Sequence, residues 1–191
     1  MGRVISRATM NLLAWNEELD RNPPWAPTRL TVPSISEPSP DNRSTANILH
    51  EDGSVASNHF LDNATVSLDY GKQYTFSLFG KPINREWMRI IGLNGAFFTA
   101  NFNFTTGAIG FQQNLDYIET RLVGNGWYRV WYVITSNING ILPNFIHYTA
   151  SADNASTFDG LNQDSLYVWR PQINEGFVPD PDFLTQEVAR T

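Results

Sequence analysis

The residues of this 191-residue chain that could do chemistry are carboxylates, three histidines and many aromatic rings, because cysteine is absent. A glycosidase needs two carboxylates about 5 Å apart, or a somewhat wider pair. On a strand such a pair would occupy alternate positions, and no apolar strand-like segment carries one. Glu17-Glu18, Glu51-Asp52, Asp180 and Asp182 lie in polar or proline-rich surroundings, which favours a solvated surface. The sequence therefore indicates no catalytic residue, and we expect a protein that is not an enzyme.

The histidines are His50, His59 and His147, and none pair at the spacings typical of a zinc site. His50 and His59 flank Glu51-Asp52-Gly53, which leaves open a turn carrying metal-binding carboxylates, although a plain loop is the favoured interpretation. His147 lies within an apolar segment and is expected to be a satisfied sheet residue. No nucleophile elbow, phosphate-binding loop or dinucleotide fingerprint occurs. We therefore expect no metal and no cofactor.

Exposed aromatic rings are the remaining candidates, because sugar rings stack on indoles and phenols. Trp25, in a proline-rich frame, and Trp87, at the start of a strand, are the candidate sugar-stacking residues. The alternative is that both cap the ends of the core. Trp127, Trp131 and Trp169 lie within strong strand patterns, which predicts that they belong to the core.

Residues 73–79 and 100–104 show the period-2 alternation that positions side chains on the two faces of a β-strand. Residues 127–134 are apolar on both faces apart from Arg129, which predicts a central strand covered on both sides, and residues 145–149 and 165–169 supply two more strands. Residues 11–49 hold most of the prolines, so we expect extended, edge-like or looped structure there. Only residues 11–19 could form a short helix. Short strands separated by Gly, Asn and Asp turns predict an all-β fold, a two-sheet jelly-roll sandwich.

The chain is predicted to have an N-terminal arm, residues 1–10, a sandwich domain, residues 11–178, and a proline-rich C-terminal tail, residues 179–191. Its net charge of −6 argues against nucleic-acid binding, and no apolar stretch is long enough to span a membrane. The arm has two arginines, no acidic residue and two adjacent apolar residues. We expect it to contact a partner through Arg3, Val4, Ile5 and Arg7.

Four motifs occur in order along the chain: Asn11–Glu18, Tyr74–Ser77, Gly124–Arg129 and Leu166–Trp169 followed by Gln172–Gly176. Together they resemble a carbohydrate-binding-module-like β-sandwich that recurs in bacteriophage structural proteins. The chain departs from that pattern at Arg170-Pro171 and in its Asp-Pro tail. The motif residues look like core and turn positions, so the resemblance implies a fold and a virion setting more than a ligand.

The resemblance implies a virion structural protein, with a capsid decoration (cement) protein on the outer shell as the first hypothesis. Its partners would be the major capsid protein or other virion proteins. The alternative is a carbohydrate-binding receptor-recognition module of a tail fibre or adhesin, which would bind a host-surface glycan. We also expect a homo-oligomer, a trimer before a dimer, because decoration proteins match lattice symmetry. Large apolar residues in and near loops support that expectation: Trp25, Trp87, Phe97, Phe98, Phe111 and Phe177.

Overall fold

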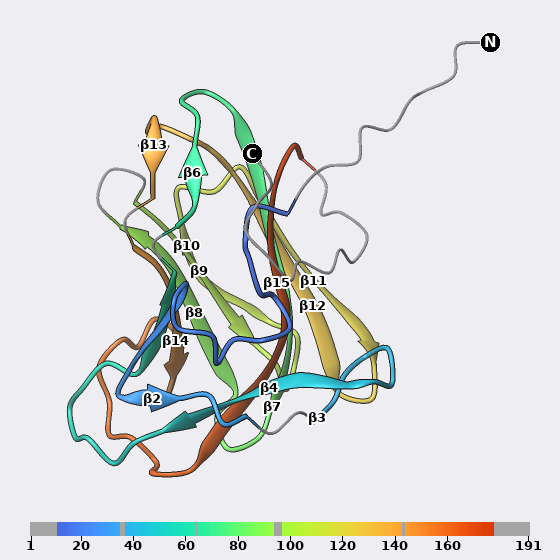
Figure 1. Ribbon diagram of the computed structural model, residues 1–191, viewed down its shortest axis with the longest axis vertical. Coiled ribbons are helices and arrows are strands. Elements are labelled where there is room, and N and C mark those ends of the chain that lie inside the picture. The colour runs from blue at the N-terminus through green and yellow to red at the C-terminus, as the bar shows by residue number, and fades with distance from the viewer. Residues whose placement is uncertain (1–10, 35–36, 64, 94–96, 143, 178–191) are drawn as a thin grey trace.

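The protein folds as an all-β sandwich in the computed structural model, which describes residues 11–34, 37–63, 65–93, 97–142 and 144–177 (Figure 1). Within these residues there is no helix, so none that is long and apolar enough to cross a membrane. Two antiparallel sheets face each other across the core, and a small two-stranded sheet, β6 with β13, lies at one end. The predicted two-sheet β-sandwich is confirmed.

The first sheet has six strands in the order β1-β5-β14-β8-β9-β10. Its strands are β1 (Trp25–Thr28), β5 (Phe60–Asn63), β14 (Asn144–Ala150), β8 (Trp87–Leu93), β9 (Phe98–Asn103) and β10 (Ile109–Gln113). The second sheet has seven strands in the order β11-β12-β7-β15-β4-β2, with β3 also paired to β4. They are β2 (Leu30–Thr31), β3 (Glu37–Pro38), β4 (Ser44–Glu51), β7 (Gln73–Pro82), β11 (Tyr117–Gly124), β12 (Trp127–Thr135) and β15 (Asp164–Glu175). The small sheet pairs β6 (Ser67–Leu68) with β13 (Gly140–Ile141).

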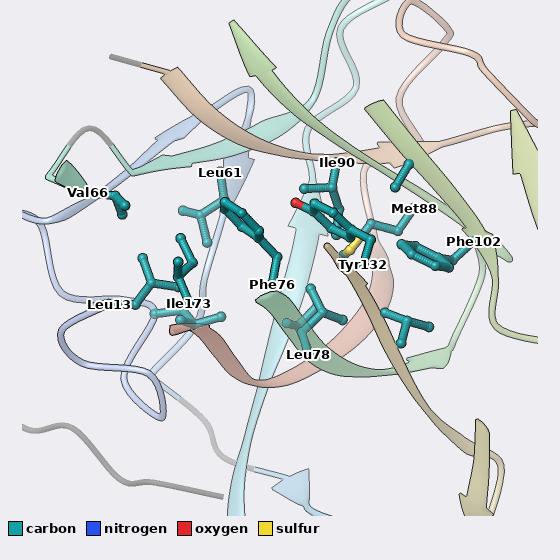
Figure 2. Close-up of a cluster of buried hydrophobic side chains, with 14 of the residues drawn as sticks. Leu13, Leu61, Val66, Phe76, Leu78, Met88, Ile90, Phe102, Tyr132 and Ile173 are labelled. Carbon is teal, nitrogen blue, oxygen red and sulfur yellow. The ribbon is translucent and has the colours of Figure 1, made fainter. Parts of the chain in front are cut away.

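Along the strands of the second sheet, side chains point alternately toward the first sheet and away from it, and those that point toward it form the core. Phe76 on β7 and Tyr132 on β12 are neighbours in the ladder and stack face to face, with ring centroids 5.0 Å apart and an interplanar angle of 6°. Figure 2 shows these rings among aliphatic side chains from both sheets, Ile90 and Met88 of β8 included. Each such side chain contributes about 1.5–3 kcal/mol when it is fully removed from water.

Two expectations for the proline-rich segment need correction. Residues 11–19 form turns instead of a helix, with Trp15 at a left-handed φ of 55°. Leu13 and Leu19 are both buried in the core, and a six-residue separation would place them on different sides of a helix. The expectation of extended, edge-like or looped structure over residues 11–49 is also wrong for residues 44–49, because they belong to β4, which lies inside the sheet between β15 and β2. The last proline within residues 11–49 is Pro40, so the restriction that proline places on backbone conformation and hydrogen bonding does not extend to β4.

Candidate functional site

A hollow lies on the outer face of the seven-stranded sheet, on the side away from the core. Its volume is about 490 Å³, within the roughly 300–1,000 Å³ typical of small-molecule sites. We call it the outer groove. Its lining residues come from the β3–β4 connection, from β7 and β15, and from the β11–β12 hairpin: Pro40, Asp41, Phe79, Arg121, Leu122, Val123, Arg129 and Trp169.

The floor of the outer groove is a pair of aromatic rings. Phe79 lies opposite Trp169 in the ladder, and their ring centroids are 4.9 Å apart at 58°. Both rings point away from the main core because Phe76 and Leu78 occupy the inward positions of β7. The indole N–H of Trp169 donates to Thr45 Oγ1 at 2.9 Å, which orients the ring. The floor is therefore a second, smaller aromatic cluster on the outside of the sheet.

Two arginines continue the same row across the sheet. Arg129 of β12 lies opposite Phe79, and Arg121 of β11 lies opposite Arg129. The guanidinium carbon of Arg129 is 5.2 Å from the centroid of the Phe79 ring, within cation–π distance. Arg121 is exposed and Arg129 is half-buried. The sheet register thus brings two positive charges together at one end of the groove.

The wall beside the arginines is the β11–β12 hairpin. Asn125 and Gly126 form its two-residue turn with φ values of 51° and 78°, the left-handed conformation that a type I′ turn requires. The turn sets the register that positions Arg121 against Arg129. Leu122 and Val123 are 57% and 42% exposed, so the wall presents apolar surface to a bound molecule.

The opposite wall is held by a network of four charged residues from distant parts of the chain. Glu17 Oε1 accepts from Arg170 Nε at 2.6 Å and from Arg43 at 2.8 Å. Arg43 Nε also donates to Asp41 Oδ2 at 2.6 Å. The guanidinium of Arg170 lies 4.2 Å from the centroid of the Trp169 ring. The network fixes Asp41 at the rim and covers one side of the floor.

Asp41 is the one carboxylate among the residues that line the groove, and its environment keeps it ionised. Burial raises its pKa, but hydrogen bonds from the Ser39 hydroxyl at 2.6 Å and from Arg43 outweigh that effect, so the pKa lies below its ordinary value. The charge of Asp41 is thus satisfied within the wall by its own neighbours.

Trp131 extends this face beyond the groove. Val130 and Tyr132 point into the core, so Trp131 shares the outer face with Arg129, two residues before it on β12. In the ladder it lies opposite Ser77 and Glu119, and it is half-buried. The prediction that Trp131 belongs to the core is therefore wrong, whereas Trp127 and Trp169, at 2% and 1% exposure, are buried.

The two predicted sugar-stacking residues are not brought together. Trp25 is fully buried, and its indole N–H donates to the Trp15 carbonyl at 3.3 Å, so it has no free ring face and the prediction is wrong for it. The proline frame of Trp25 suggested a loop, but β1 positions the ring against the core. Trp87 is half-buried at the start of β8, in the other sheet.

The histidines and the acidic pairs have structural roles. Glu51 is fully buried and accepts three hydrogen bonds from Arg85 at 2.9–3.2 Å, so the expected solvated surface is wrong there, as it is for the largely buried Glu17. His59 is buried, lies 3.1 Å from Asp52 and stacks on Phe158. In the described part of the chain, no three His, Asp or Glu residues gather as a metal site would require.

The other two histidines lie on strands β4 and β14. His50 Nδ1 lies 2.8 Å from Asp164 across the β4–β15 pair, and His147 is on β14, where only its backbone is described. The arm residues Arg3, Val4, Ile5 and Arg7 and the tail 179–191 lie outside the described residues. The predicted arm contact therefore stays a prediction.

Of the six apolar residues offered in support of an oligomer, two are buried, Trp87 is half-buried and three are exposed. Trp25 and Phe98 are buried, which removes them from that argument. Phe97, Phe111 and Phe177 are 41%, 41% and 48% exposed. Exposed apolar surface is compatible with an interface, and the homo-oligomer stays a prediction.

The residues that form the groove were largely missed in the sequence. Phe79 continues the alternating segment 73–79 and falls on the face opposite Phe76, and Arg129 is the one charge in an otherwise apolar strand. Both were visible as departures from the core pattern. Arg121 had no such signal, because β11 is an edge strand with exposed residues on both faces.

The comparisons with known proteins give a fold and no family. No protein-family model matches the chain, and no curated protein matches it. Among solved structures, it is similar to the enzymatically active domain of tailspike protein 4 of bacteriophage CBA120, with a TM-score of 0.51 and 11% identity over 87% of this chain and 21% of that chain. This chain thus spans about a fifth of the tailspike chain. The likeness is one of fold.

Two carbohydrate-binding modules resemble the chain more distantly. One is CBM1 of BiXyn10A in its apo form, with a TM-score of 0.42 and 9% sequence identity; the match covers 79% of this chain and 92% of that chain. The other is the xylan-binding domain CBM22-2 of Xyn10C from Paenibacillus barcinonensis, with a TM-score of 0.43 and 16% sequence identity; the match covers 88% of this chain and 98% of that chain.

Proposed function

We propose that this chain is a non-catalytic carbohydrate-binding module that recognises a host-surface glycan as part of a phage virion. The observation that carries the proposal is the outer groove, a hollow of about 490 Å³ above the nearly buried rings of Phe79 and Trp169, with arginine side chains along one edge. Apolar surface with a few well-placed polar groups is the general composition of a ligand site. The exposed hairpin wall, Leu122 and Val123, supplies the apolar contact, and Arg121 and Arg129 supply the donors.

Trp131 is the aromatic residue that we assign to ligand contact on this face. It is half-buried and lies on the same face of β12 as Arg129, so part of its indole is available beside the groove. A glycan that lies across the sheet would meet the arginines first and Trp131 next. We expect Trp131→Ala to weaken glycan binding by about tenfold or more, since large rings contribute strongly to contact surfaces.

Trp87→Ala is the matched control, because Trp87 is also a half-buried tryptophan but belongs to the other sheet. The full chain and both variants would be screened on a glycan array, and the affinity for the strongest ligands measured by calorimetry. Thermal unfolding would show that both variants fold. Retained binding by Trp131→Ala together with loss by Trp87→Ala would move the site to the other sheet. A full chain that binds no glycan would refute the proposed function.

The virion setting is the second part of the proposal. The sequence resemblance to phage structural domains motivates it, and the fold is shared with a phage tailspike domain. Receptor recognition would place the protein on the tail. Labelled antibody on purified particles tests this directly, and absence of the protein from purified virions would overturn it.

Capsid decoration stays a prediction from the sequence. It depends on the arm, residues 1–10, and on the tail, both outside the described residues. Imaging of particles with and without the protein distinguishes a shell location from a tail location. Removal of residues 1–10 should weaken attachment to the shell if the hypothesis is right, and unchanged attachment would contradict it.

A further inference from the structure

Strand β11 is an open edge of the seven-stranded sheet. It pairs with β12 on one side, and in the described part of the chain no strand pairs with it on the other. Its eight residues are all exposed or half-buried, and Leu122 is 57% exposed. An open edge presents backbone N–H and C=O groups to which a strand of another chain can add. β11 is therefore an interaction surface whose side chains select the strand that fits it.

The side chains of β11 are arranged almost symmetrically about Thr120. Acidic Glu119 and basic Arg121 lie on either side of it, and the apolar residues Ile118 and Leu122 lie beyond them. If two copies pair antiparallel with Thr120 opposite Thr120, Glu119 of each copy lies opposite Arg121 of the other. Ile118 of each copy then lies opposite Leu122 of the other. Opposite charges and apolar pairs at directly opposed positions both stabilise an antiparallel sheet.

The neighbouring two-fold pairings of the same strand bring like charges together. A two-fold axis perpendicular to the sheet keeps each face on its own side, so the axis lies level with a residue and not between two residues. An axis at Glu119 opposes two carboxylates, and an axis at Arg121 opposes two guanidinium groups, which destabilises a sheet. Charges on an edge strand commonly prevent edge-to-edge pairing. Here they permit the register centred on Thr120 and disfavour the registers beside it.

The part of β11 that would pair is held in place by its own chain. The β11–β12 ladder is regular up to Leu122 and has a bulge before Gly124, which ends the paired segment. Thr120 Oγ1 donates to the Gly107 carbonyl at 2.6 Å, at the centre of that segment. Ile118 packs against the core, so Leu122 of a second copy would extend an existing apolar contact.

We infer that two copies of this chain pair edge to edge through β11, antiparallel and centred on Thr120, to form a two-fold dimer with one continuous sheet. The partner is a second copy because the strand is complementary to itself. This pairing gives a dimer in place of the trimer expected first from lattice symmetry. Because the axis is perpendicular to the sheet, the two outer grooves would lie on the same face, where a repetitive ligand could occupy both. The inference does not depend on the proposed function.

Charge reversal tests the register. Sedimentation analysis of the full chain is expected to show a dimer that dissociates on dilution. Glu119→Arg and Arg121→Glu each oppose like charges at two positions of the dimer, and each should weaken dimerisation by about tenfold or more. Mixed in equal amounts, the two variants restore both opposite-charge pairs and should form a heterodimer. Arg21→Glu, which reverses an exposed charge outside β11, should leave dimerisation unchanged.

A cysteine at the axis gives a second measurement that does not depend on charge. The chain has no cysteine of its own. Directly opposed residues of antiparallel strands have Cβ atoms about 4.5–5.5 Å apart, close to the spacing that a disulfide bond requires. Thr120→Cys should therefore form a disulfide-linked dimer with oxidised glutathione as the oxidant. Ser44→Cys is the control, because Ser44 is exposed on β4 of the same sheet, away from β11, and should stay uncrosslinked.

The outcomes either support the pairing or overturn it. A full chain that sediments as a monomer or a trimer would overturn it, as would a dimer that both charge variants leave intact or mixed variants that do not associate. Equal cross-linking of Thr120→Cys and Ser44→Cys would show random collision and would also overturn it. Thermal unfolding shows whether each variant folds, and the cysteine pair decides the matter if a charge variant does not. None of these readouts measures glycan binding, so failure here leaves the proposed function untouched.

Discussion

The two faces of the seven-stranded sheet use aromatic residues for different purposes. On the inner face, Phe76 and Tyr132 stack on each other at 5.0 Å and are closed off by the second sheet. On the outer face, Phe79 and Trp169 pack at 4.9 Å, and arginine side chains cover them in place of a second sheet. Aromatic burial by charged side chains removes the rings from water while leaving a polar surface for recognition. The same strands thus carry a stabilising face and the face on which we propose that a glycan binds.

The largest expected effect is on the inner face. Phe76→Ala should lower the free energy of unfolding by about 3–5 kcal/mol, because it leaves a cavity between two sheets. Phe79→Ala, three residues along the same strand, should cost less, because arginine side chains and the Pro40–Asp41 connection can relax into the space. Urea denaturation of both variants measures the difference. An equal or larger cost for Phe79→Ala would show that the outer cluster is as rigid as the core.

The next effect concerns the charge network of the outer face. Glu17→Gln should destabilise the protein by about 1–3 kcal/mol, because Arg170 would lose its partner at 2.6 Å in a site where both side chains are only 9% exposed. Glu18→Gln is the control: its pair with Arg21 at 2.7 Å is exposed and should contribute less than about 1 kcal/mol. The same denaturation experiment applies. Similar small losses would mean that the Glu17 network does not stabilise the groove wall.

A smaller effect is expected where the inner face contains a polar atom. Within the described residues the buried hydroxyl of Tyr132 has no hydrogen-bond partner, and burial raises its pKa well above the ordinary value. Tyr132→Phe should therefore change stability by less than about 1 kcal/mol or increase it. Tyr74→Phe should cost about 1 kcal/mol, because the Tyr74 hydroxyl accepts a 2.9 Å hydrogen bond from the Asp69 N–H. A marked loss in Tyr132→Phe would reveal a partner for that hydroxyl.

The smallest effect is a pH dependence at the groove rim. The pKa of Asp41 is lower in the folded protein than its ordinary value of 3.8, so the ionised form favours folding. That stabilisation is present above pH 3.8 and is lost as the pH falls below it through the folded value. Asp41→Asn should therefore be less stable than the parent near pH 7, and the gap should narrow below pH 3.8. The gap is expected to be small because the carboxylate is partly exposed. A stability difference between Asp41→Asn and the parent protein that widens below pH 3.8 would contradict this prediction.

Strands with one buried face could be predicted from the sequence because burial imposes alternation. The alternating segment 73–79 falls within β7, and the apolar segments 127–134 and 165–169 fall within β12 and β15; all three strands contribute side chains to the core. The edge strand β11 was missed, because its residues are exposed on both faces and no alternation is required of it. Strand prediction thus failed at the exposed edge strand β11, and it also missed the central strand β4, which follows directly on a proline-rich segment.

The site shows what only the tertiary structure decided. Trp25 appears in the sequence as an exposed loop residue, yet it is buried because β1 lies against the core. Glu17 pairs with Arg170, which is 153 residues away in the sequence. Trp169, Arg129 and Arg121 lie in one row across four neighbouring strands because of the strand order and register of the sheet. The sequence by itself determined the fold class, since period-2 burial is a local property of each strand. The groove depends on strand order and register, which are set by packing between segments far apart in the chain.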